Sequence, residues 1–344
     1  MSRQLSLFEI AKKPEQRFSD ELSVDVVELW SGIGGFSAGA RNAGHKVRLS
    51  IDPHADRAQI HARNFQDCLH ITSELPCDDI IRYLPPPKSA WHMHANPPVS
   101  HLSQANGGNV REKEEKLART EKGLESVIWY LDLVEQAKPA SWTMEGVNHP
   151  EMLRELEARG ITYVVSHMER WGLPQCRVRV IAGSMHLIRR FEGLERPHDL
   201  VPVKAVIKLP VPGARIKGSC ATYSAKSKPG SNESRVVPLI KRSRCCNKPS
   251  LTVIGVGHTL VWCNSEGEKV RQLSPQENAA LQSFPKTYIF HHRKKDANVS
   301  IGEAFPPMIA EKIMSKYKLP RTLWPADPPQ AVFPEQLWNS DDEQ

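Results

Sequence analysis

The stretch VDVVELWSGIGGFSAGARNAGHKVRLSID at residues 24–52 decides the fold. A β-rich run leads into a glycine-rich turn at Gly32, Gly34 and Gly35, and a helix-compatible segment follows before a second β-rich run ends at Asp52. A turn of this kind lets unpaired N–H groups at the start of a helix face a carboxylate or a phosphate. Asp52 is placed to accept hydrogen bonds from ribose hydroxyls. A structural tight turn would also need the glycines, but Asp52 favours a ribose-containing cofactor.

The same alternation of β-rich and helix-compatible segments continues to about Met185. Chains that alternate in this way form α/β folds in which a parallel sheet is wound between helices. Catalytic loops are then expected at the carboxyl ends of the strands. The β-rich runs beyond the opening stretch are WHMHA (91–95), SWTME (141–145), TYVVSHM (162–168) and RVRVIAGS (177–184).

A basic region follows between residues 189 and 262, where Pro, Gly and Ser are frequent and 14 Lys and Arg face four Asp and Glu. Neutralisation of nucleic-acid phosphates requires such an imbalance, although a solvated basic surface would also show it. Helical patterns return at 274–284 and 306–317. We therefore divide the chain into a flexible tail (1–22), a catalytic and cofactor-binding domain (23–188), a small basic domain (189–265), a return to the catalytic domain (266–318) and a C-terminal tail (319–344).

Composition limits the classes of protein that fit. With 344 residues, of which 40% are hydrophobic, the chain is long enough for a large core and a smaller domain, and its net charge is +7. No run approaches the roughly 18 apolar residues of a membrane span, and no secretion signal is recognised, so we expect a cytoplasmic, nucleoid-associated protein. The seven cysteines contain no CxxC pair. We therefore expect reduced thiols, with neither a disulfide framework nor a metal site.

Six segments resemble, in order, the motifs of the DNA cytosine-5-methyltransferase family. They are LWSGIGGFSAG (29–39), HANPPVSHLS (94–103), TMEGV (143–147), GLPQCRVRV (172–180), RQLSPQENAALQSFP (271–285) and IGEAFPP (301–307). The resemblance implies an α/β, Rossmann-like domain that depends on S-adenosylmethionine, with a small basic target-recognition domain. It also implies double-stranded DNA as the partner and a base flipped out of the duplex.

The resemblance also assigns roles to individual residues. It implies a cofactor site formed by Ser31, Gly32, Gly34, Gly35, Phe36, Asp52, Ile71 and Pro97. It implies a catalytic group formed by Asn96, Pro97, Pro98, Val99, Glu145, Arg177 and Arg179. The loop at 103–110 is expected to close over the flipped base. DNA contacts are expected from Ser103, Gln175, Lys226, Lys228, Arg242 and Arg244.

Val99 occupies the position of the family's cysteine nucleophile. Family members add a thiolate to carbon 6 of cytosine, while a glutamate in the position of Glu145 hydrogen-bonds the ring nitrogen. Ser100 has no identified base to activate it, and Cys176 is expected to be a buried thiol. Three more positions depart from the family pattern, with His70 replacing an aspartate that meets the adenine, and Gly146 and Glu303 replacing asparagines.

Three functions stay open. First, Asn96-Pro97-Pro98-Val99 resembles the (Asp/Asn/Ser)-Pro-Pro-aromatic motif of exocyclic-amine DNA methyltransferases, although Val99 lacks the aromatic ring. In that motif a side-chain oxygen and a proline carbonyl accept the amino hydrogens of cytosine or adenine. Second, the chain is a non-catalytic DNA-binding regulator or partner subunit. Third, it methylates carbon 5 of cytosine through an unrecognised nucleophile.

The N-terminal tail carries Gln4-Leu5-Ser6-Leu7-Phe8, which matches the pentapeptide by which bacterial proteins bind the sliding clamp of replication. Leu7 and Phe8 would enter an apolar pocket, and Gln4 would hydrogen-bond its rim. The start of an amphipathic helix would give the same pattern. The match predicts a bacterial or phage-like host and recruitment to newly replicated DNA.

Overall fold

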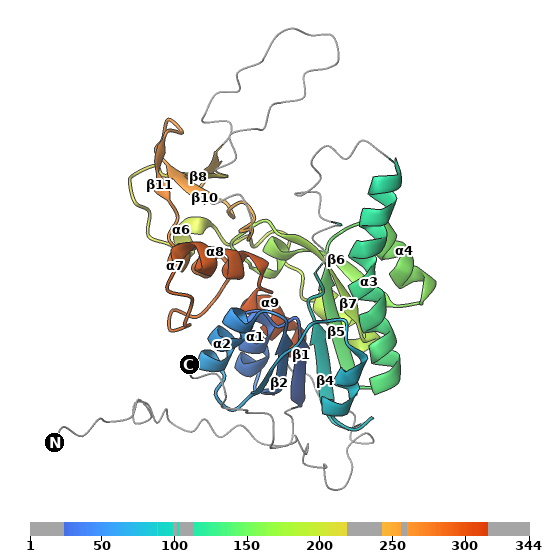
Figure 1. Cartoon of the computed structure of the whole chain (residues 1–344). Coiled ribbons are helices and arrows are strands. Elements are labelled where there is room, and N and C mark those ends of the chain that lie inside the picture. The colour runs from blue at the N-terminus through green and yellow to red at the C-terminus, as the bar shows by residue number, and fades with distance from the viewer. Residues whose placement is uncertain are drawn as a thin grey trace, which may run out of the picture.

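A seven-stranded sheet forms the centre of the molecule (Figure 1). The computed structural model describes residues 24–87, 89–98, 102, 113–218, 243–255 and 260–315, without the side chains of 113–119. In sheet order, the strands are β3 (Leu69–Thr72), β2 (Lys46–Asp52), β1 (Asp25–Leu29), β4 (Trp91–Ala95), β5 (Ser141–Gly146), β7 (Val178–Gly183) and β6 (Thr162–His167). The α/β class predicted from the sequence is confirmed.

The sheet is mixed rather than fully parallel. Strands β3, β2, β1, β4 and β5 are parallel, as the sequence predicts. Strand β7 lies between β5 and β6 and runs antiparallel to both. Only residues 168–177, which include the short 3-10 helix η4 (Met168–Trp171), connect β6 to β7. A parallel pair needs a crossover of about a dozen residues or more, so this connection favours an antiparallel pair.

Two layers of helices cover the sheet, with α1 (Gly35–Asn42), α5 (Met185–Glu192) and α9 (Pro307–Met314) on one face and α3 (Lys113–Ala137) and α4 (Pro150–Ala158) on the other. Side chains of strand β1 pack against both helix layers, because successive side chains of a strand point to opposite faces of the sheet. Val26 lies in the same buried cluster as Phe36 of α1. Val27 and Leu29 lie in the cluster of Val127 from α3. The carboxyl ends of the strands are therefore held from both sides.

The backbone of α1 lies directly against the segment that leads into α9. A side chain at Gly35 would overlap the carbonyl oxygen of Phe305, and one at Gly39 would overlap that of Pro307. A backbone oxygen cannot move aside as the end of a flexible side chain can, so both positions need a residue without a Cβ. This contact joins the first helix of the fold to its last one.

A second, antiparallel sheet has four strands, which are, in sheet order, β11 (Lys269–Gln272), β10 (Leu260–Cys263), β8 (Arg215–Gly218) and β9 (Arg244–Cys245). It lies above the helices α7 (Pro275–Leu281) and α8 (Lys294–Glu303) in Figure 1. Ile216 and Trp262 of this sheet share one buried cluster with Leu281 of α7 and Ile301 of α8. The remaining elements are α2 (Ala55–Asn64), α6 (Val203–Val206) and the 3-10 helix η2 (Asp78–Tyr83).

The structure moves both predicted boundaries of the small basic domain. The boundary at residue 188 falls inside α5, whose Leu187 and Phe191 belong to the core of the large sheet. The boundary at residue 265 falls in the turn between β10 and β11, which pair with each other. Paired strands of a hairpin form one structural unit. The small sheet therefore extends to Gln272.

Among the described residues, no helix is both long enough and apolar enough to cross a membrane. The cysteines within the described ranges are free thiols, namely Cys68, Cys77, Cys176, Cys245, Cys246 and Cys263.

Gln175 is a buried residue whose side chain links separate segments through hydrogen bonds. Its amide nitrogen donates to the Leu281 carbonyl at 2.9 Å and to Gln282 Oε1 at 2.6 Å, and its oxygen accepts from the Val253 N–H at 2.8 Å. The side chain is 0% exposed. The amide is therefore enclosed and both of its ends bind protein, while the contact of Gln175 with DNA stays a prediction.

Replacing Gln175 with Leu is expected to lower the free energy of unfolding by about 3 kcal/mol, because the Val253 N–H and the Leu281 carbonyl would stay buried without this partner. Urea unfolding followed by circular dichroism measures the change. Gln272→Leu on the exposed strand β11 is the matched control and should change stability by about 0.5 kcal/mol or less. Equal effects of the two substitutions would contradict the role of Gln175 as a link between segments.

Candidate active site

The loops that follow three neighbouring strands lie side by side at one edge of the large sheet. Leu29 of β1 pairs with Ala95 of β4, and Ala95 pairs with Met144 of β5. The next residue on β1 leads into the glycine loop, and the next residue on β4 is Asn96, which begins the Asn96-Pro97-Pro98 loop. The next residue on β5 is Glu145, near the end of that strand. Because β4 lies between β1 and β5, Asn96 lies between the glycine loop and Glu145.

Gly32 presents its backbone to open space, as close approach of a cofactor requires. Its φ is 54°, and no atom lies within 4 Å of the place where a Cβ would be. Its N–H donates to Asp52 Oδ2 at 2.8 Å, and Asp52 Oδ1 accepts from the N–H of His54 at 2.9 Å. Asp52 is 3% exposed. Asp52 therefore fixes the backbone of the glycine loop through these hydrogen bonds. A ribose hydroxyl could donate to the remaining lone pairs of the Asp52 carboxylate. Nearby, Ser31 Oγ and Ser50 Oγ are 2.7 Å apart.

Phe36 faces the protein core rather than the cofactor loop. It is fully buried, and its ring stacks on that of His94 with 3.6 Å between centroids. The ring therefore belongs to the packing between α1 and β4, and a cofactor contact of Phe36 stays a prediction. The glycines that precede it also serve packing, since a side chain at Gly34 would overlap the His61 ring and Gly35 lies on Phe305.

Trp30 is a candidate cofactor residue that the sequence pattern did not single out. It directly precedes the loop and has a φ of 49°, in the left-handed region that residues with side chains rarely adopt. Its ring is 7% exposed and lies edge-on to Trp129 with 5.6 Å between centroids. Strained backbone of this kind is often found at ligand-binding loops. The available sequence signal was an aromatic residue next to the glycine turn.

Ile71 and His70 lie on β3, the edge strand that pairs with β2. Ile71 is half-buried and pairs with Ile51 of β2, so its apolar side chain is available to line a pocket. His70 Nε2 lies 2.8 Å from His61 Nδ1 of α2, within hydrogen-bond distance. The residue that replaces the family's aspartate is thus directed toward another imidazole of the same chain.

Asn96 is fixed at the end of β4 by two hydrogen bonds. Its backbone N–H donates to the Leu29 carbonyl at 3.2 Å, and its side-chain nitrogen donates to the Glu303 carbonyl at 3.2 Å. Pro97 is buried and Pro98 is exposed. The first proline therefore holds the loop against the fold, while the second lies at the surface.

Glu145 lies almost fully buried between two arginines. Its Oε1 is 3.3 Å from Arg179 Nε and 3.5 Å from Arg177 Nη2, yet this oxygen accepts no hydrogen bond in the described structure. Arg177 is held by the carbonyls of Val253 and Gly302 at 3.2 and 3.1 Å. Burial, together with the neighbouring charge of Arg177, lowers the pKa of Arg179 to about 10. The cluster is cationic overall, because two arginines share one buried carboxylate.

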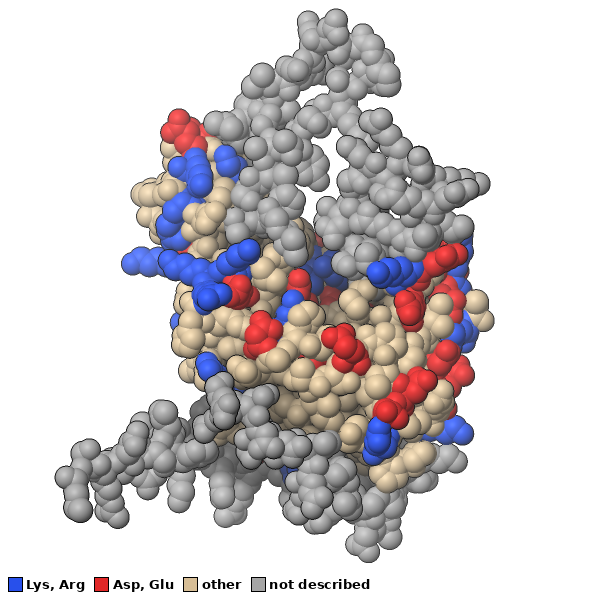
Figure 2. Space-filling view, in the orientation of Figure 1, with Lys and Arg blue, Asp and Glu red and all other residues tan. Residues whose placement is uncertain are grey.

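Lys and Arg gather over the small sheet and the region beneath it in Figure 2. Arg244, a predicted DNA contact, is tied to the fold, because its Nη1 lies 2.6 Å from Cys176 Sγ and 3.2 Å from the Pro249 carbonyl. Burial raises the pKa of the Cys176 thiol, although Arg244 opposes this shift. Several predicted residues lie outside the described ranges, namely Gln4, Leu5, Leu7, Phe8, Val99, Ser103, Lys226, Lys228 and Arg242.

Comparisons with known proteins agree with this arrangement. The profile of the C-5 cytosine-specific DNA methylase family matches residues 210–319. The chain is 22% identical to the Type II methyltransferase M.HindV of Haemophilus influenzae over 84% of this chain and 94% of that protein. It is 23% identical to the Type II methyltransferase M.AplI of Arthrospira platensis over 98% of this chain and 99% of that protein.

Solved structures show the same fold. A prophage-encoded E. coli protein, described as a DNA modification methyltransferase, superposes with a TM-score of 0.55 at 20% identity over 85% of this chain and 97% of that one. The DNMT2 of Spodoptera frugiperda superposes with a TM-score of 0.53 at 15% identity over 85% of this chain and 99% of that one. The solved structures therefore show that the chain shares their fold, and the family profile and the curated relatives show that it is similar to the DNA cytosine-5-methyltransferase family.

Proposed function

We propose that this chain transfers a methyl group from S-adenosylmethionine to the exocyclic amine of a cytosine in double-stranded DNA. The position of Asn96, between the glycine loop and Glu145, carries the proposal. Its amide nitrogen donates to the Glu303 carbonyl, which directs the amide oxygen away from Glu303. A fixed acceptor at this place suits amine chemistry, whereas Val99 supplies no thiolate for carbon-5 chemistry.

The chain's own groups suit transfer to nitrogen. An exocyclic amine is a weak nucleophile, because its lone pair is delocalised into the ring. The Asn96 oxygen and the Pro97 carbonyl would accept the two amino hydrogens and direct the lone pair toward the methyl group. S-adenosylmethionine supplies that methyl group on a sulfonium. The C–N bond forms as the methyl–sulfur bond breaks, the electron pair stays on sulfur, and the amine releases one proton to solvent.

Glu145 and its two arginines favour cytosine over adenine as the base. Asn96 and Pro97 would take both amino hydrogens, so this cluster would bind the ring edge beside the amine. Arg179 lies 3.3 Å from Glu145 Oε1 and is a cationic donor at this place. Cytosine presents two acceptors, N3 and O2, beside its amino group, and an arginine can donate to them.

A non-catalytic DNA-binding scaffold is the second candidate, and two contacts favour it. Glu303 Oε2 pairs with Arg57 Nη2 at 2.7 Å, and His70 binds His61. Both positions depart from the family pattern, and protein partners already occupy their polar atoms. Carbon-5 methylation through Cys176 is disfavoured, because the raised pKa of this thiol leaves little thiolate at neutral pH.

Asn96→Ala is expected to reduce methylation roughly 100-fold, because one acceptor for the amine is lost. Asn96→Asp keeps an oxygen at the same place and is expected to retain activity. The measurement is nucleoside mass spectrometry of DNA from methylation-deficient cells that express each variant, and the expected product is N4-methylcytosine. Asn247→Ala, on an exposed turn, is the control and should match the wild type.

Each of the other possible methylation products would indicate a different reaction. N6-methyladenine would move the target to the other amine-bearing base, and 5-methylcytosine would show carbon-5 chemistry without the family's cysteine. DNA with no new base, from cells that contain folded protein, would overturn the proposal in favour of the non-catalytic scaffold. Thermal melting of each purified variant separates loss of chemistry from loss of fold.

Val99→Cys is expected to gain 5-methylcytosine formation, because a thiol then stands in the family's nucleophile position and Glu145 with its arginines is retained. The product is measured by the same mass spectrometry. A duplex that contains 5-fluorocytosine should also trap the variant covalently, and Glu145→Gln in the same background should abolish trapping. A folded Val99→Cys protein that binds DNA without either outcome would contradict a cytosine pocket at Glu145.

We further propose that the N-terminal pentapeptide binds the bacterial sliding clamp. Leu7→Ala combined with Phe8→Ala is expected to abolish co-purification with the clamp, because both apolar anchors are removed. Pull-down of purified clamp by the full chain measures this, with Leu5→Ala as a milder variant. Unchanged pull-down by the double variant would remove the clamp from the partners of this protein.

A further inference from the structure

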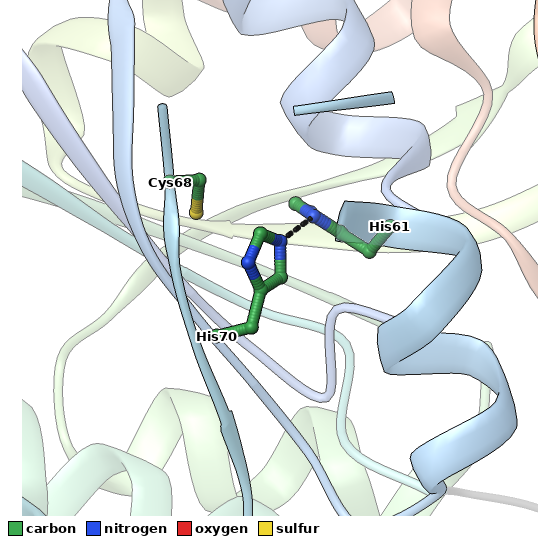
Figure 3. A group of neighbouring side chains, drawn as sticks. All are labelled: His61, Cys68 and His70. Carbon is green, nitrogen blue, oxygen red and sulfur yellow. Dashed lines mark hydrogen bonds between the residues drawn. The ribbon is translucent and has the colours of Figure 1, made fainter. Parts of the chain in front are cut away.

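Three metal-binding side chains converge beside the glycine loop (Figure 3). His61 comes from α2, His70 from β3, and Cys68 from the turn between them. Their donor atoms all lie within 4.8 Å of one another. In Figure 3 the two imidazole rings point toward one another and the Cys68 sulfur points toward His70. The family resemblance placed only His70, at the position of an aspartate that meets the adenine, and the sequence predicted no metal site.

We propose that His61, Cys68 and His70 bind one divalent zinc ion, and that this ion fixes α2 to the edge strand β3. Two imidazoles and one thiolate are ligands that zinc prefers. Three protein ligands leave one position of a tetrahedral site for water. This inference is independent of the reaction proposed above, because it concerns metal binding and not methyl transfer.

The two histidines face one another at nearly the separation of two ligands of one metal ion. A neutral imidazole keeps one ring nitrogen with a lone pair that can bind a metal. His61 Nδ1 and His70 Nε2 are 2.8 Å apart. Tetrahedral zinc places its nitrogen ligands roughly 3.3 Å apart, given Zn–N distances of about 2.0–2.1 Å. The rings therefore need to separate by about half an ångström to admit the ion.

A series of hydrogen bonds orients the His61 ring on the side away from His70. His61 Nε2 lies 3.1 Å from Ser37 Oγ, and Ser37 is hydrogen-bonded through its hydroxyl to Glu28 Oε2. Metal-binding histidines commonly donate their second ring nitrogen to such a partner, which fixes the ring and the tautomer. With Nε2 donating to Ser37, the lone pair of His61 is on Nδ1, the atom that faces His70.

Two acidic groups at the site can balance a dication. Glu28 is 2% exposed, and its Oε2 lies 3.9 Å from His61 Nε2. Cysteine binds zinc as the thiolate, so Cys68 and Glu28 together can supply two negative charges to a bound Zn²⁺.

The site would stabilise the cofactor loop through direct packing. The His61 ring lies where a side chain at Gly34 would be, and His70 pairs with Ser50 on β2, two residues before Asp52. An ion bound between α2 and β3 would therefore hold both supports of the loop that contains Gly32. His70 is only half-buried, which gives an ion a route into the site.

The test uses the purified full chain, loaded with zinc and then desalted. Mass spectrometry of the metal content is expected to find about one zinc per chain. Loading with Co²⁺ instead should give the near-ultraviolet charge-transfer band of a cobalt–thiolate bond. Cys68→Ser should lose this band and bind zinc at least tenfold more weakly. Cys263→Ser, which changes another buried thiol, should keep both properties.

Wild-type protein that retains no stoichiometric zinc would overturn the proposal, as would a cobalt–thiolate band that survives Cys68→Ser. If Cys68→Ser does not fold, His70→Ala on the half-exposed side of the site replaces it and should also weaken zinc binding. Thermal melting with added zinc should raise the midpoint of the wild type and of Cys263→Ser but not that of His70→Ala. None of these measurements depends on methylation, so failure of this proposal is distinguishable from failure of the proposed reaction.

Discussion

The backbone contact between α1 and the segment before α9 is the constraint on which the site depends. It exists because Gly35 and Gly39 lack side chains where the carbonyls of Phe305 and Pro307 pass. The contact brings residues 301–304 over the strand ends, where their carbonyls accept hydrogen bonds from side chains of three other segments. These donors are Asn96, Arg177 and Gln282. The glycine loop, the Asn-Pro-Pro loop and the cluster of Glu145 with Arg177 thus share one support.

That shared support orders the side chains at the strand ends. Arg177 is fixed by backbone carbonyls and lies beside Glu145, so segments distant in sequence hold the charged cluster at the end of β5. Asn96 likewise takes its orientation from Glu303. Loss of the family's cysteine removes one chemical route while the groups that would hold and orient a base stay in place.

Much of the site follows from local sequence, because parallel strands all place their carboxyl ends at one edge. The alternating pattern predicted functional loops at this edge, and the structure places Gly32, Asn96 and Glu145 there. The end of the second strand likewise predicted that Asp52 would lie near the glycine turn, and it accepts the Gly32 N–H. The predicted helix at 306–317 corresponds to α9, and its packing on α1 follows from none of these patterns.

The sequence by itself determined the α/β class, the glycine loop, and the missing thiol at Val99, because strand alternation, glycine turns and residue identity are local properties. Only the tertiary structure decided that Phe36 and Gln175 are buried, since the segments that enclose them come from distant parts of the chain. It alone brought His61 to His70, because the packing of α2 on the sheet sets their distance. The periodicity of a sequence indicates on which face of its own helix or strand a side chain lies. It does not indicate which residues pack against that face.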